Sequence, residues 1–597
     1  MERISQRFNG QLERNETHVS GFRVLEYVSV GVSDAPASTG SKLSRNMIVQ
    51  LEEPPVRPAS RTTWRHRLGI TALFTGLTAL MTWPQALVFG THAADHHDIF
   101  FNLWRFSWIA HTLLRSPLNL FNGNVFYPER GVLAYSDATL LEGIIAAPLL
   151  LAGLPPMMVH NCLLLGAIVA SGAGMFAFAR QQTGSQTAAM LAGIVFAFAP
   201  YRFEHYMHME LQWTVWVPWA FFWLQRTIET PTVKAGVLTG VFVALQMLSS
   251  IYYGIFLALL LAAVALLQIV ALPWRRSLQC LRVLAIGGLI AGAVSLAYSR
   301  PYTEASRLVG TRSRLEVAMF SAQPRDYKVA SETNYLYGEQ YPGRGERRLF
   351  PGVLPLLLAL AGLLLIPHTP ATVAYLVGLV LAFELSLGVY GVVYPFLYDH
   401  VSAFRGLRAP ARISVFGLFF LGVLAARGAA ALATLARPAV RQAVTVLFCA
   451  IIVLEYWVAP LPLIRYPNNP PALYKWLATQ PRGIVVEFPM LHPSVPGYES
   501  RYAYMSTFHW MPLLNGYSGY FPPAYMRRLH LLAEQFPDAE SVAQLRADGV
   551  RYIIVHSGGY SPKERHHIVS TLIRDHGLAL VADFEDGWGE GAVFVLP

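Results

Sequence analysis

Long apolar runs separated by short polar segments constrain the fold of this 597-residue chain more than any other feature. An α-helix needs about 20 apolar residues to cross the hydrocarbon core of a bilayer. The longest run, 235–272, exceeds one crossing at about 1.5 Å per residue, so we divide it at Ser249-Ser250-Ile251-Tyr252-Tyr253-Gly254. Eleven full spans are then predicted, near 68–89, 158–179, 187–200, 211–225, the two halves of 235–272, 283–299, 349–366, 371–393, 412–432 and 442–462.

The composition excludes a soluble multidomain protein. Apolar residues make up 54% of the chain and charged residues only 14%, with a mean hydropathy of +0.38, whereas soluble domains carry about 25% charged residues. The net charge of +10 would suit nucleic acid, but the cations lie mostly in short loops between apolar runs. That placement fits membrane topology and anionic lipids, so no nucleic-acid partner is expected.

Basic clusters set the predicted orientation, because Lys and Arg concentrate in cytoplasmic loops. The cytoplasmic clusters are Arg226-Lys234, Arg275-Arg276-Arg282 and Arg427-Arg437-Arg441. Counting from them places the N-terminus in the cytoplasm and treats 139–153 as a short re-entrant or interfacial segment. The outer segments are then 91–138, 201–210, 300–348, 394–411 and everything after 463.

Both ends of the chain differ from this membrane domain, which is predicted over 61–463. Residues 1–60 are polar and aperiodic, which predicts a disordered cytoplasmic extension; a start at Met47 is the alternative. Residues 464–597 form a predicted extracytoplasmic α/β domain. Its expected elements are strands at 484–488 and 552–556, a helix at 539–548 and a further strand near 592–596.

The first outer loop holds the most informative polar residues. Asp95 and Asp98 follow a span directly and precede a stretch rich in Trp and Phe, so an amphipathic helix is expected to hold them at the membrane–water boundary. A carboxylate there is suited to accept a proton from an acceptor that attacks a lipid-borne substrate. Solvated loop acids are the alternative. Asp137 and Glu142 follow further along the loop.

Histidines in the outer loops offer a second hypothesis, a divalent metal site. His92, His96 and His97 lie beside the two aspartates, and His205 and His208, three residues apart, are predicted to share one helical face. No spacing matches a zinc signature, so no metal is favoured. The sequence requires no cofactor, and a divalent cation stays an open alternative. The candidate ligands are His97, His205 and Glu210.

Two outer segments rich in arginine are candidates for binding a phosphate, because guanidinium groups bind phosphates with paired hydrogen bonds. One segment contains Arg347. The other contains Arg408 and Arg412, four residues apart, which predicts one shared helical face with Pro410 at the helix entry. Contact with lipid phosphates at the membrane surface is the alternative explanation.

Several short patterns occur along the chain from about Leu68 to the C-terminus. They are Asp98-x3-Asn102-x-Trp104, Leu120-Phe121, Phe126-Tyr127-Pro128, Ala134-Tyr135-Ser136, Phe198-Ala-Pro200-Tyr201-Arg202-Phe203, His208, Phe404-Arg-Gly-Leu-Arg408-Ala-Pro410-Ala-Arg412, Ser506-Thr507-x-His509-Trp510 and Asn515-Gly516-Tyr517-Ser518-Gly519. Together these patterns resemble bacterial integral membrane proteins of the GT-C glycosyltransferase superfamily. The chain looks like a distant relative of protein O-mannosyltransferases and aminoarabinose transferases.

The resemblance implies a multi-span core with a catalytic acid in the first outer loop and a polyprenyl-phosphate or polyprenyl-diphosphate sugar donor. Asp98 matches the acid of the family's Gly-Asp pair, although His97 replaces the glycine. Asp137 or Glu142 would be the second acid. His208 and the pair Arg408 and Arg412 fall where contacts to the donor phosphate are expected.

The resulting hypothesis is a hexosyl- or pentosyltransferase of the bacterial inner membrane. Asp98 would act as general base on a glycan, lipid or protein acceptor at the outer face, and arginines would neutralise the departing phosphate. A non-enzymatic transporter or flippase of lipid-linked glycans is the first alternative, and a cell-envelope assembly protein is the second.

Overall fold

The computed structural model describes residues 64–338, 345–493, 495, 497–585, 587 and 590–597. These residues belong to one compact unit. The predicted extension over 1–60 and the alternative start at Met47 lie outside the described residues.

Each predicted span contains an α-helix. The helices are α1 (Trp64–Met81), α4 (Pro156–Thr183), α5 (Gln186–Phe198), α8 (Trp216–Glu229), α9 (Val233–Ser249), α10 (Ile251–Val270), α11 (Trp274–Val309), α13 (Val353–Leu365), α14 (Pro370–Ser386), α16 (Ser414–Leu435) and α17 (Arg441–Glu455). Among the described residues, five helical segments have the length and apolar composition of a membrane crossing. The protein is therefore a multi-pass membrane protein, and the number of eleven spans stays a prediction.

Local sequence explains where these helices begin and end. Helix α1 ends at Met81, before the predicted limit of 89, because Pro84 lacks an N–H group and restricts the residue before it. The predicted division of 235–272 is present: α9 ends at Ser249, Ser250 is extended, and α10 begins at Ile251. The segment predicted as short, 139–153, contains the 12-residue helix α3 (Leu140–Leu151).

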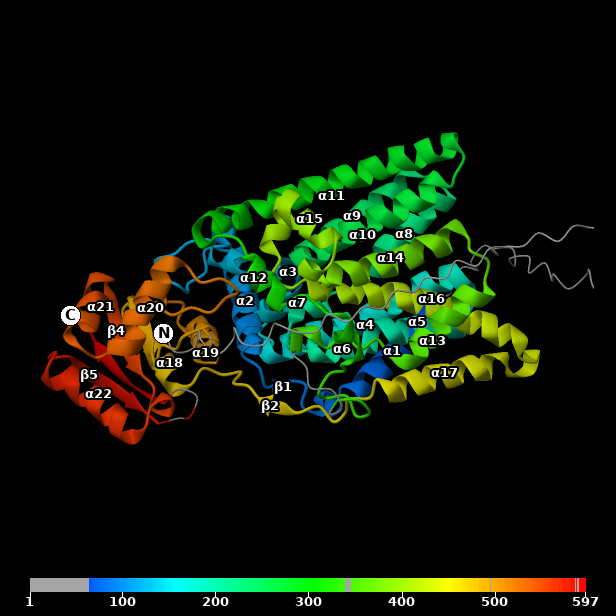
Figure 1. The fold of residues 1–597 in the computed structure, drawn as a ribbon. Coiled ribbons are helices and arrows are strands. Elements are labelled where there is room, and N and C mark those ends of the chain that lie inside the picture. The colour runs from blue at the N-terminus through cyan, green and yellow to red at the C-terminus, as the bar shows by residue number, and fades with distance from the viewer. Residues whose placement is uncertain (1–63, 339–344, 494, 496, 586, 588–589) are drawn as a thin grey trace, which may run out of the picture. The chain divides into compact units, whose positions relative to one another are not determined.

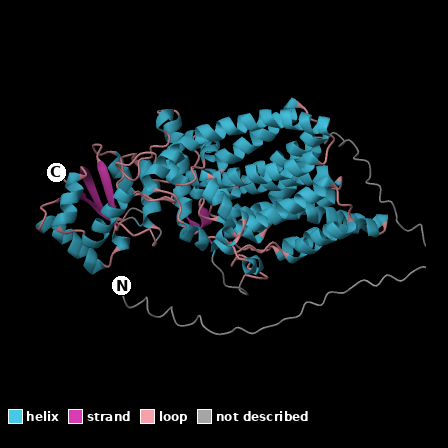
Figure 2. Ribbon diagram, turned by 45° about the horizontal axis from the view of Figure 1, so that its top comes forward, coloured by secondary structure: helices cyan, strands magenta, loops and turns pink. Residues whose placement is uncertain are grey.

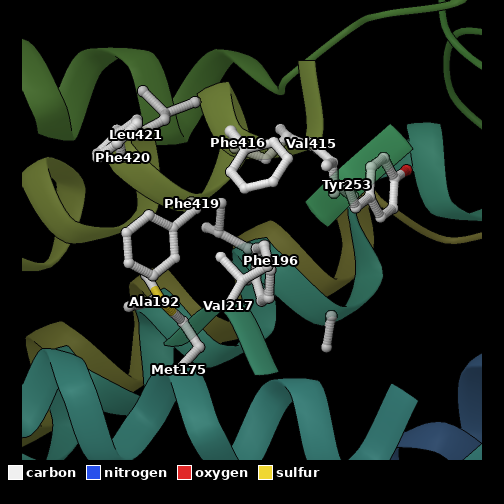
Figure 3. Packing of buried hydrophobic residues seen from close by; sticks show 14 of the residues in the cluster. Met175, Ala192, Phe196, Val217, Tyr253, Val415, Phe416, Phe419, Phe420 and Leu421 are labelled. Atoms are coloured by element: carbon white, nitrogen blue, oxygen red, sulfur yellow. The ribbon is translucent and has the colours of Figure 1, made fainter. Parts of the chain in front are cut away.

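Aromatic side chains form the core of the helical region (Figure 3). Phe419 of α16 stacks on Phe221 of α8 with ring centroids 4.6 Å apart and on Phe178 of α4 at 5.2 Å. Phe196 of α5 meets Phe419 edge to face. Helix α16 is the most buried of the candidate spans, and much of α11 and α17 is exposed. Exposed apolar side chains on α11 and α17, at the periphery of the helical region, suit contact with lipid.

Small residues let α9 and α11 approach closely along their length (Figure 1). A Cβ built on Gly240 would overlap the backbone of Gly287, and one on Gly287 would overlap the carbonyl group of Gly236. Such contacts between small residues are a main source of helix association in membranes.

The remaining elements lie in the loops and in the C-terminal segment, where Figure 2 shows the main sheet. The loop helices are α2 (His97–Leu113), α6 (Pro200–Glu204), α7 (Met209–Gln212), α12 (Arg314–Met319) and α15 (Val393–His400). The C-terminal helices are α18 (Ala472–Ala478), α19 (Tyr498–Met505), α20 (Pro523–Gln535), α21 (Ala539–Ala547) and α22 (Pro562–Arg574). The strands are β1 (His92–Ala94), β2 (Leu463–Arg465), β3 (Ile484–Phe488), β4 (Val550–Val555), β5 (Ala579–Phe584) and β6 (Gly591–Val595).

The C-terminal strands form one mixed sheet in the order β3-β4-β6-β5. Strands β3 and β4 are parallel, and β6 runs antiparallel to both β4 and β5. The predicted strands and the helix between them are therefore present, whereas a separate domain on the outer side stays a prediction. Strand β1 of the first loop pairs with β2, and this pairing places His92 opposite Arg465.

The contact between α9 and α11 predicts a specific instability. Gly240→Leu is expected to destabilise the protein by about 1–3 kcal/mol or more, because the added side chain has no room, and to lower the melting temperature of the detergent-purified chain. Gly288→Leu is the matched control, since a Cβ at Gly288 meets nothing within 4 Å. Equal melting temperatures for the two variants would contradict this packing.

Candidate active site

Asp98 lies in the first turn of α2, where its backbone is held by the preceding histidine. The Asp98 N–H donates to Nδ1 of His96 over 3.1 Å, so His96 caps the helix. This bond requires an unprotonated Nδ1, and burial lowers the pKa of His96 to about 4. The local sequence thereby fixes the Asp98 carboxylate at the start of the predicted amphipathic helix.

Two side chains from distant parts of the chain bind the Asp98 carboxylate. The Tyr517 hydroxyl donates to Oδ1 over 2.7 Å, and Nε2 of His208 lies 3.1 Å from Oδ2. His96 and His97 add ring nitrogens at 3.8 Å. Asp98 is therefore the centre of a polar cluster drawn from the first loop, the 201–210 segment and the C-terminal segment.

The charges of Asp98 and His208 stabilise each other. Burial opposes ionisation of Asp98, but the hydrogen bond and charge of His208, with His96 and His97, outweigh it and hold the pKa of the carboxyl well below its usual range. Burial likewise favours neutral His208, and its bond to Asp98 outweighs burial and raises the pKa of His208. Asp98 is consequently ionised at neutral pH.

Glu346 and Arg412 form a second ion pair next to this cluster. Nε of Arg412 donates to Glu346 over 3.1 Å, and a second guanidinium nitrogen contacts the other carboxylate oxygen. Burial opposes ionisation of Glu346, but Arg412 overcomes it and holds the pKa of Glu346 far below normal. Nε2 of His205 lies 3.9 Å from Glu346, and Nδ1 of His205 lies 3.4 Å from Nδ1 of His208.

Arg408 differs from Arg412 in having no carboxylate partner within the described ranges. Its backbone N–H donates to the Tyr252 hydroxyl over 2.8 Å, and its guanidinium lies 5.2 Å from the ring centroid of Phe320. Burial and Asp98 raise the pKa of Tyr517, and the positive charge of Arg408 acts against them. Arg408 is thus a half-buried cation within electrostatic range of the residue that bonds Asp98.

The structure corrects the predicted helical face shared by Arg408 and Arg412. Arg408 precedes a 3-10 turn, Pro410–Ile413, and α16 begins only at Ser414. Pro410 disfavours a helical conformation at the residue before it, and the two guanidiniums have different surroundings. Arg347, the third predicted phosphate ligand, lies 3.6 Å from Asp326 and is also matched by an acid.

The predicted helical face of His205 and His208 is likewise wrong. Helix α6 ends at Glu204 and α7 begins at Met209, so the two histidines lie in the turn between short helices. The turn nevertheless brings their rings together, at 5.3 Å between centroids.

Asp137, one of the two acids predicted to assist Asp98, binds other groups. Asp137 accepts hydrogen bonds from the Ser250 hydroxyl at 2.9 Å and from the Ile251 N–H at 3.1 Å, which caps α10 at the break between α9 and α10. Burial and the nearby Glu210 raise the pKa of Asp137 to about 7. Glu142 is fully buried within α3.

Arg105 of α2 contacts Glu210 and the backbone of Asp137. This buried arginine contacts Glu210 at 3.2 Å, together with the Asn102 side chain and the Asp137 carbonyl. Glu210, a candidate metal ligand from the sequence, therefore pairs with a guanidinium. In the part of the chain that the structure describes, the one group with metal-binding geometry is His96, His97 and Asp98, whose ligand atoms lie within 4.8 Å of one another.

Sequence reasoning missed three residues of the site. Tyr517 lies inside the Asn515–Gly519 pattern that was noted for its resemblance and received no role. Tyr252 was seen only as part of a break, and Glu346 only as one acid in an arginine-rich segment. Their roles depend on contacts between segments far apart in the chain, which no local pattern encodes.

Comparison with known proteins gives structural matches only. No protein-family model and no curated protein matches the chain. The apo oligosaccharyltransferase of Archaeoglobus fulgidus is 11% identical, with a TM-score of 0.44 over 82% of this chain and 69% of that one. ArnT from Cupriavidus metallidurans is 12% identical over 88% of this chain and 98% of its own, with TM-scores of 0.47 bound to undecaprenyl phosphate and 0.45 in the apo state.

The roles of individual residues rest on the geometry of this chain.

The mutual stabilisation of Asp98 and His208 predicts a titration. The raised pKa of His208 means that the ion pair is complete at acidic to neutral pH and is lost as pH rises through the folded-state pKa of His208. Asp98→Asn removes the anion and leaves burial unopposed, so the pKa of His208 should fall below 6.5. NMR titration of labelled histidines, with His208→Gln to assign the signal, measures this, and an unchanged His208 midpoint would contradict the pairing.

Proposed function

We propose that the chain is a membrane glycosyltransferase that moves a sugar from a polyprenyl-phosphate-type donor to an acceptor at the outer face of the inner membrane. The observation that carries this proposal is that two opposite charges with different surroundings both act on Tyr517. Asp98, which accepts the Tyr517 hydrogen bond, is a firmly ionised carboxylate, and Arg408 is a cation without an acidic partner among the described residues. An acceptor hydroxyl and a donor phosphate are the groups that such a pair would bind.

Asp98 acts on the acceptor in this proposal. The acceptor oxygen attacks the anomeric carbon, the bond between that carbon and the phosphate oxygen breaks, and the acceptor proton passes to Asp98. A carboxylate with a low pKa is a weak base, so it takes the proton late, when the acceptor oxygen has become acidic by bonding to carbon. Tyr517 and His208 keep the carboxylate aimed and ionised.

Arg408 acts on the donor. The departing phosphate gains negative charge, and a guanidinium stabilises that charge through two parallel hydrogen bonds. Arg412 keeps Glu346 in place instead. Tyr252 contacts both arginines: its hydroxyl accepts from the backbone N–H of Arg408, and its ring centroid lies 5.1 Å from the Arg412 guanidinium. Asp137 supports this arrangement by accepting from the N–H of Ile251, the residue before Tyr252, at the start of α10.

A divalent cation is compatible with the residues present. His96, His97 and Asp98 offer the nitrogen and oxygen ligands that such ions take. A bound cation would add positive charge near the donor phosphate. Asp98 already has Tyr517 and His208 as partners, so the proposed transfer requires no metal-dependent step.

Replacing Asp98 tests the proposal directly. Asp98→Asn preserves the shape and a hydrogen-bond acceptor for Tyr517 but removes the base, so transfer should fall about 10²- to 10⁴-fold. The assay follows radiolabel from polyprenyl-phosphate hexoses or pentoses into the glycan, lipid and protein fractions of membranes that contain the chain. Asp95→Asn, an exposed acid of the same loop, is the matched control. Full activity of a well-folded Asp98→Asn variant would favour the transporter hypothesis.

Replacing Arg408 tests the donor side. Arg408→Gln should lower transfer about 10²- to 10³-fold, because the charge that develops on the phosphate loses its cation. The exposed Arg405, which bonds the Tyr398 and Asp399 carbonyls, provides the control Arg405→Gln. Equal losses in the two variants would refute a specific role for Arg408.

A further inference from the structure

Tyr517 reaches Asp98 from a loop in the C-terminal segment, and its ring packs against two other rings. The ring meets Phe101 edge to face at 5.2 Å and His97 at 5.3 Å. The Tyr517 hydroxyl meets Asp98 only when the backbone just before Tyr517 is held in place. The groups that hold Asn515 and Gly516 therefore decide whether the Asp98 site is complete.

The Asn515 side chain binds this loop to the sheet. Its Oδ1 accepts from the Glu487 N–H and its Nδ2 donates to the Glu487 carbonyl, both over 2.8 Å, so the amide pairs with β3 as a neighbouring strand would. The Asn515 carbonyl accepts from the Phe126 N–H over 2.8 Å. A Cβ on Gly516 would overlap the Phe126 ring, which explains the glycine.

Glu499 of α19 also holds this loop. This buried carboxyl accepts from the Gly516 N–H over 3.2 Å and lies 3.4 Å from Nδ2 of Asn515. The Tyr525 hydroxyl lies 3.4 Å from the same carboxyl and 3.3 Å from the Gly516 carbonyl. Glu499 thus contacts both residues that precede Tyr517, through donors that are all uncharged.

A second buried carboxyl nearby, Glu487, contacts other partners. The Tyr474 hydroxyl donates to Glu487 over 2.6 Å, and Nε2 of His556 lies 2.7 Å from it. His556 Nδ1 faces the Glu590 carbonyl at 2.9 Å. Tyr474 and His556 therefore bind the Glu487 carboxyl, and Glu499 is the carboxyl whose hydrogen bonds hold the loop before Tyr517.

We propose that Glu499 is a positioning residue for the Asp98 site. It holds the backbone at Asn515 and Gly516 so that the Tyr517 hydroxyl meets Asp98. The C-terminal segment thereby completes the site through the contacts from Glu499 to Gly516 and from Tyr517 to Asp98. The effect on sugar transfer rests on the proposed function, whereas the effect on Tyr517 does not.

The protonation of Glu499 is consistent with this role and guides the choice of variants. Burial raises the pKa of Glu499 to about 8, against hydrogen bonds from Asn515, Gly516 and the backbone at Leu491. Near neutral pH the group is therefore largely an uncharged acid whose carbonyl oxygen accepts from Gly516. Glutamine is its uncharged analogue of equal length, and aspartate is too short to reach the same N–H.

The first experiment follows Tyr517 itself. 3-Fluorotyrosine is placed at position 517 of the full chain in detergent, and its ¹⁹F chemical shift is recorded. Glu499→Ala and Glu499→Asp should move the signal toward that of the unfolded chain, and Glu499→Gln should keep it near the unmodified value. If Glu499→Ala does not fold, the comparison of Asp with Gln decides. A signal that is unchanged in the folded Asp or Ala variant overturns the proposal.

The second experiment measures transfer. Glu499→Ala should lower kcat about 10- to 100-fold and leave KM for the lipid donor unchanged. This is the factor expected when the hydrogen bond from Tyr517 to the charged Asp98 is lost. Tyr517→Phe should cause a similar loss, and the double variant should be no worse than either single one. Asp583→Asn, an exposed partner of Arg565 in the same segment, is the control. Additive losses in the double variant would overturn the chain of contacts.

If neither the parent chain nor any variant transfers sugar, the proposed function fails. The fluorine experiment still tests the positioning role of Glu499 in that case, because it does not depend on transfer. If transfer is present and the fluorine signal does not respond to Glu499, the positioning role fails and the proposed function stands.

Discussion

The buried charge of Asp98 is the constraint on which the surrounding structure depends. A carboxylate taken out of water is costly unless hydrogen bonds and an opposite charge replace its hydration. Here the replacements come from two other segments: His208 from the turn between α6 and α7, and Tyr517 from the C-terminal segment. Losing one partner would leave the charge poorly compensated, so the three segments are bound to one geometry.

Charge pairing also separates the arginines by role. Arg412, Arg348 and Arg105 are buried or nearly so, and each contacts a carboxylate. Such pairs fix backbone geometry but leave little positive potential for a ligand. Arg408 lies in the same region without an acid among the described residues and packs on Phe320. The site thus combines a rigid frame of neutralised pairs with one cation that keeps its capacity to bind an anion.

The sequence predicts the helices well and the site only in part. Apolar runs predict a helix in each region where the structure has one of these helices, and the polar pair Ser249-Ser250 predicts the division between α9 and α10, because these features are local. Asp98, His208 and Arg408 were found as candidates from residue type and predicted side of the membrane. Tyr517, Glu346 and the capping role of Asp137 were not, because each depends on a contact across more than 60 residues of sequence.

The short β1–β2 ladder affects how the protein is made. Asp98 and Tyr517 are separated by 419 positions, so the site stays incomplete while the chain is being synthesised, even after all the apolar helices have been inserted. Pairing of 92–94 with 463–465 brings the start of the C-terminal segment beside the first loop and shortens the loop that remains to be closed. A chain truncated after α17 would therefore resemble the complete protein within the bilayer and still lack a finished site.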